Sequence, residues 1–73
     1  MAARRPSKIW RIVIPSPDGP AITPQRSETA TRNAVEAEKQ TTTADRITVE
    51  KWEDGRWGEW LRWVRTDHTW NAE

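Results

Sequence analysis

The sequence predicts an α+β fold of two layers, in which one helix covers one face of a three-stranded sheet. A β-branched and aromatic run, KIWRIVI at 8–14, predicts the first strand. A stripe of small apolar residues within 27–40 predicts the helix. An Asp-Gly pair inside the Trp-rich segment 45–65 predicts a hairpin that supplies two more strands. The expected chain order is therefore β-α-β-β.

The first strand is expected to end before Pro15, because proline has no N–H to give to a strand ladder. Its alternation places Trp10, Ile12 and Ile14 on one face. The next segment, PSPDGP at 15–20, holds three Pro and one Gly. That composition predicts a loop leading to the helix.

The helix is expected to begin after Ser27, whose hydroxyl can cap the free N–H groups of the first turn. Glu28 suits the positive end of the helix dipole, and Lys39 suits the negative end. The apolar stripe consists of Ala30, Ala34, Val35 and Ala37. Small side chains let a helix lie close to a sheet, but they bury little area.

The hairpin is expected to turn through a loop of three or five residues around Asp54-Gly55. A two-residue turn would place Glu50 opposite Glu59, which is unfavourable. A loop with an odd number of residues keeps odd positions together, so one face is expected to collect Ile47, Val49, Trp57, Leu61 and Trp63. The other face is expected to collect Trp52 and Trp60, with Arg46, Arg56 and Arg62.

A helix over 57–66 is the rival interpretation, since Trp57, Trp60, Leu61 and Val64 also share a helical face. Gly58 and the preceding Asp-Gly turn favour a strand. The third strand carries large apolar groups on both faces, so it is expected to lie centrally, in sheet order 1-3-2. This topology resembles the first three-quarters of a ferredoxin-like βαββαβ fold over residues 8–65.

Three regions are expected along the chain. Residues 1–7 form a flexible basic arm, residues 8–66 form a single β-α-β-β domain, and residues 67–73 form a C-terminal tail. The tail contains one indole, Trp70, which can fold back onto the domain.

Composition excludes several classes of function. The chain has no Cys, and His68 is its one His, so no disulfide, metal site or cofactor is expected. No Ser lies near that His in sequence and no Gly-rich phosphate loop occurs, so no enzyme is expected. No apolar run approaches the ~20 residues of a membrane helix, and a cytoplasmic protein without membrane association is expected.

The predicted Trp/Arg face is the sharpest candidate for a binding site. Trp and Arg are the residues most enriched at interface hot spots, so Trp52, Trp60, Arg46, Arg56 and Arg62 are expected to bind a protein partner. Cover by the tail or by a second copy of the chain, giving a homodimer, is the structural alternative.

The functional alternative is a single-stranded nucleic-acid binder that stacks bases on the same face. It would add the basic N-terminal residues Arg4, Arg5, Lys8 and Arg11. Acidic residues of the hairpin, Glu50 and Glu59 among them, would repel phosphates.

The chain has nine Arg against three Lys, and both Ala and Trp are frequent. In this composition it resembles the small accessory proteins of actinobacteria and their bacteriophages. The resemblance implies a host protein as the class of target.

Overall fold

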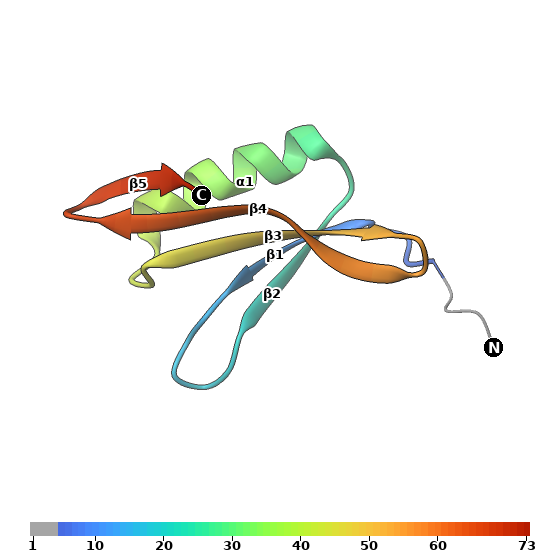
Figure 1. The fold of residues 1–73 in the computed structure, drawn as a ribbon, viewed down its shortest axis with the longest axis horizontal. Helices are drawn as coiled ribbons and strands as arrows, with labels where there is room; N and C mark the ends of the chain where they lie inside the picture. Colours follow the sequence, from blue (N-terminus) through green and yellow to red (C-terminus); the bar gives the residue numbers. More distant parts are fainter. Residues whose placement is uncertain (1–4) are drawn as a thin grey trace.

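The computed structural model describes residues 5–73 as a five-stranded antiparallel sheet with one α-helix (Figure 1). The strands are β1 (Trp10–Ile14), β2 (Ala21–Gln25), β3 (Arg46–Glu53), β4 (Arg56–Thr66) and β5 (Thr69–Ala72), and the helix is α1 (Glu28–Thr41). Their order across the sheet is β2-β1-β3-β4-β5. The α+β class is confirmed, but the three-stranded sheet of order 1-3-2 is wrong.

Strand β2 follows the predicted loop at 15–20, in a segment for which the sequence predicts no strand. Gly19, at φ 108°, turns the chain, and its N–H donates to the carbonyl of Ser16 at 3.0 Å. The chain then returns along β1, pairing Ile14 with Ala21. This extra reversal makes β3 antiparallel to β1 and places β3, rather than β4, in the centre of the sheet. Pro24 makes β2 difficult to predict from the sequence, since proline within a strand is tolerated only at a sheet edge or a bulge.

Strand β5 occupies the segment predicted as a C-terminal tail. Asp67 and His68 form a two-residue turn with φ of 51° and 66°, the left-handed conformation that a type I′ hairpin requires. Trp70 then donates its indole N–H to the carbonyl of Lys39 at 3.2 Å, so β5 is anchored to α1. At the other end of the chain, the predicted basic arm lies partly outside the described residues.

The β3–β4 hairpin also has a two-residue turn, at Asp54 and Gly55. The predicted loop of three or five residues is therefore wrong, and Glu50 does lie opposite Glu59. Two arginines offset the repulsion: Arg11 binds Glu50 at 2.5 Å, and Arg62 binds Glu59 at 2.9 Å. Ion pairing from a neighbouring strand is a contact that the hairpin sequence alone does not show.

One residue of β4 has no partner in this hairpin. Glu50 pairs with Glu59, but Val49 pairs with Leu61, so the register shifts and Trp60 forms a β-bulge. Because β4 is a strand throughout, the rival helix over 57–66 is also wrong.

Helix α1 forms as the sequence predicts. The hydroxyl of Ser27 accepts a hydrogen bond from the N–H of Ala30 at 3.1 Å, with Glu28 in the first turn and Lys39 in the last. No helix within residues 5–73 has the length and apolar character needed to span a bilayer.

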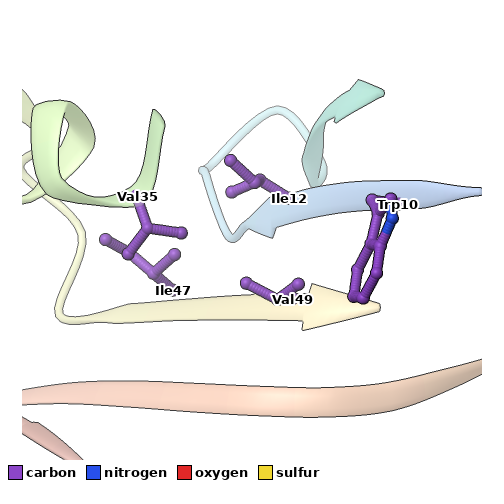
Figure 2. Close-up of a cluster of buried hydrophobic side chains, with 5 residues drawn as sticks. All are labelled: Trp10, Ile12, Val35, Ile47 and Val49. Carbon is purple, nitrogen blue, oxygen red and sulfur yellow. The ribbon is translucent and has the colours of Figure 1, made fainter. Parts of the chain in front are cut away.

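The core lies between α1 and the three inner strands and consists of five buried apolar side chains, drawn in Figure 2: Trp10, Ile12, Val35, Ile47 and Val49. Val35 approaches Ile47 from the helix. The buried hydroxyl of Thr31 is satisfied by the carbonyl of Ser27 at 2.7 Å. Within residues 5–73, no helix or second sheet covers the opposite face.

Replacing His68 by glycine is expected to raise the free energy of unfolding by about 0.5–1 kcal/mol. A non-glycine side chain in the left-handed region costs about 1–2 kcal/mol, and glycine avoids this cost. Glycine also increases the conformational entropy of the unfolded state, which offsets part of the gain. Urea denaturation measures the change. The matched variant Gly55→Ala, at φ 78°, is expected to lower stability by about 1 kcal/mol. A destabilising His68→Gly would contradict this account of the turn.

Candidate functional site

The bulge at Trp60 sorts the six Trp residues between the two faces of the sheet. Four lie on the side of α1, where they form or contact the core: Trp10, Trp60, Trp63 and Trp70. Trp52 and Trp57 lie opposite each other on the other side, with ring centroids 5.6 Å apart in an edge-to-face arrangement. We call this other side the outer face.

The outer face is built by strand alternation from three central strands. Its residues include Arg11 and Val13 of β1, Thr48, Glu50 and Trp52 of β3, and Trp57, Glu59 and Arg62 of β4. Most of these side chains are half-buried by their neighbours on the sheet. The surface therefore mixes indole rings with charges of both signs.

The structure separates the two indoles that the sequence places together. Trp60 points to the helix side, where its ring lies 4.6 Å from that of Trp10. Trp57, predicted for the core face, joins Trp52 on the outer face instead. The reason is the change in pairing at the bulge. Between the turn and Trp60, even-numbered residues of one strand pair with odd-numbered residues of the other. Beyond Trp60, odd-numbered residues pair with odd-numbered ones and even with even. A sequence-based face assignment that assumes one register fails on one side of a bulge.

The three arginines predicted for the site also divide. Arg62 lies on the outer face, paired with Glu59 and, at 3.7 Å, with Glu73. The hydrogen bonds that Arg62 donates to Glu59, and then the charge of Glu59, raise the pKa of Arg62 above its ordinary value. Arg46 pairs with Val64 at the far end of the same face. Arg56 pairs with Glu53 beside the turn, and alternation places it on the helix side.

Arg11 is the outer-face residue that sequence reasoning assigned elsewhere, to the basic N-terminal set. Its guanidinium reaches from β1 across β3 and lies 4.1 Å from the centre of the Trp57 ring. Its Nε donates to Glu50, and both side chains are about one-quarter exposed, at 26% and 25%. Alternation with Trp10 and Ile12 was the available signal, since it puts Arg11 on the face away from the core.

Two further members of the predicted nucleic-acid set, Arg5 and Lys8, do not join this cluster. Arg5 and Lys8 precede β1, and Arg4 lies outside the described residues. The cations that do reach the outer face near its indoles are paired with carboxylates, Arg11 with Glu50 and Arg62 with Glu59. Phosphate would have to compete with those carboxylates for the same guanidinium groups.

A hollow of about 300 Å³ lies between α1 and β4. Its walls are largely apolar and include Val35, Trp60, Leu61 and Trp63. Two cations of α1 already lie over these indoles: Arg32 at 4.9 Å from the Trp60 ring and Lys39 at 3.2 Å from the Trp63 ring. The hollow is thus a seam where the edge of the helix meets the sheet, and the cations of α1 already cover its indole rings.

Comparison with protein-family models, curated proteins and solved structures finds no match to this chain. The resemblance to actinobacterial and phage accessory proteins stays a prediction from composition. Any functional argument consequently rests on the geometry of the outer face.

Alanine in place of Trp60 is expected to lower the free energy of unfolding by about 3 kcal/mol, since its ring packs on the core. Alanine in place of Trp52 is expected to lower it by only about 1 kcal/mol, the value of one edge-to-face aromatic pair. Chemical denaturation of the two variants gives the comparison. Equal losses would mean that the two indoles share one environment, contrary to the sorting by the bulge.

Proposed function

We propose that this protein is a non-enzymatic protein-binding module whose interface is the outer face of its sheet. The observation that carries the proposal is Arg11, held against the ring of Trp57 and bonded to Glu50 on a sheet surface that no other element of residues 5–73 covers. A second layer packed on such a surface would remove half-exposed aromatic area from water.

The outer face has the features of an interface hot spot. Trp and Arg are the residue types that contribute most to measured binding energies, and they do so when a ring or pocket holds them in place. Arg11 is restrained on one side by an indole and on another by a carboxylate, so it loses little side-chain entropy when a partner binds. Trp52 extends the aromatic surface next to it.

Single-stranded nucleic acid is the alternative ligand, because indoles beside arginines can stack unpaired bases. The charges of the outer face favour a protein instead. Glu50 and Glu59 lie among the arginines and occupy their guanidinium groups, and the whole chain carries a net charge of only +1. Such a face lacks the positive field that draws in a polyanion.

The composition supports the setting. Arginine in excess of lysine and frequent Trp and Ala are typical of actinobacteria and their phages, so we place the module in the bacterial cytoplasm with a protein of the host as target. A phage accessory protein that modulates a host protein by binding fits both the small size and the outer face.

The test is capture by the tagged full chain, with variants on and off the outer face. Trp52→Ala is expected to reduce capture of a specific protein from an actinobacterial lysate at least tenfold, because it removes a predicted hot spot while leaving the fold intact. The matched control Arg56→Ala, beside the hairpin turn but off the outer face, is expected to capture normally.

Titration with single-stranded DNA and RNA at low and moderate salt completes the test. Flat isotherms are expected. Salt-sensitive binding that Trp52→Ala abolishes would replace the protein-binding proposal by the nucleic-acid alternative. Capture that both variants retain equally would remove the outer face as the interface.

A further inference from the structure

We infer that the outer face also binds a second copy of this chain, in competition with a host protein, docked outer face to outer face about a twofold axis running between β1 and β3. The inference rests on the proposed function, since it names the occupant of the same surface. Opposite charges face each other across these two strands, the strand order on either side is symmetric about the axis, and Ile22 is exposed on the same face.

Arg11 and Glu50 lie directly opposite each other on neighbouring antiparallel strands. A twofold axis parallel to the strands and midway between them brings each strand over the other strand of the second copy. Each Arg11 then meets Glu50 of the other copy, and the two chains form a four-membered cluster in which unlike charges alternate. Self-complementarity of this kind is what a twofold interface requires, because one patch must bind itself.

The hydrogen bonding of Arg11 leaves room for this second carboxylate. Within the described residues, Arg11 donates through Nε to its own Glu50, and its two terminal nitrogens have no other acceptor. The guanidinium lies over the Trp57 ring, with Cζ 4.1 Å from the ring centre. Those terminal nitrogens are therefore available to a carboxylate arriving from the second copy, in the fork geometry that arginine offers.

The strand order extends the match beyond the central pair. In the order β2-β1-β3-β4, strands β2 and β4 flank the axis symmetrically, so β2 of each copy lies under β4 of the other. Ile22 of β2, paired with Val13, alternates onto the outer face and is 49% exposed, the large hydrophobic side chain left in solvent among the described residues. Through the pairs Val13–Thr48 and Thr48–Arg62, the β4 residue of the second copy that meets Ile22 is Arg62, whose methylene groups would cover it.

Charge reversal tests this arrangement. Sedimentation across a range of concentrations is expected to show a dimer for the natural chain. Arg11→Glu and Glu50→Arg are each expected to weaken dimerisation at least tenfold, since each variant brings like charges together across the axis. Circular dichroism checks that both variants fold. The control Glu28→Arg, on the exposed surface of α1, is expected to leave the dimer unchanged.

The decisive measurement is an equimolar mixture of the two reversed variants. Each chain still carries like charges within itself, so only contacts between chains become complementary. Recovery of a mixed dimer supports the inference. A natural chain that stays monomeric, or a dimer that survives both reversals, overturns it. A monomer that still captures another protein through Trp52 would leave the proposed function standing, whereas a monomer without such capture would end both.

Discussion

The arrangement of this protein depends on one extra residue, the bulged Trp60 in β4. A tight Asp-Gly turn starts the hairpin in one register, and the bulge moves it into another between Val49 and Glu50. On the core side, the shift brings Trp60 against Trp10 and keeps Leu61 and Trp63 over the inner strands. On the other side, it leaves Trp52 and Trp57 as a pair for Arg11. The core and the candidate interface are thus two results of a single change in pairing.

Cations over indoles are the second theme of the fold. Among residues 5–73, five of the six Trp rings have a Lys or Arg within 3.2–5.0 Å of their centres, in the pairs Arg11–Trp57, Arg32–Trp60, Lys39–Trp63, Lys51–Trp10 and Arg65–Trp70. Close pairs of this type occur about once per 70–80 residues in proteins generally. In a chain without Cys, and with five buried apolar residues in the part that the structure describes, these contacts extend the packing beyond the core. On the helix side, Arg32 and Lys39 in this way cover the indoles of the seam beside α1.

The sequence was informative where structure is local and uninformative where it depends on a third segment. Ser27, Glu28 and Lys39 predict the helix and its ends, because capping and dipole effects act within one turn. Alternation correctly places Trp10 and Ile12 in the core. The two-residue turn was rejected because Glu50 would meet Glu59, and only the fold shows that Arg11 and Arg62 offset them. Strand β2 was missed because of Pro24, and β5 because no Gly marks the turn at Asp67 and His68.

The two ends of the sheet set a limit on how this chain assembles. Pro24 takes one N–H away from the free side of β2, and β5 is only four residues long. Edges of this kind make poor templates for another strand. A twofold contact between two sheet faces ends at a dimer. Pairing between edge strands can instead add further chains without limit. Pro24 and the short strand β5 therefore favour small complexes of defined size over fibrous aggregates in this Trp-rich protein.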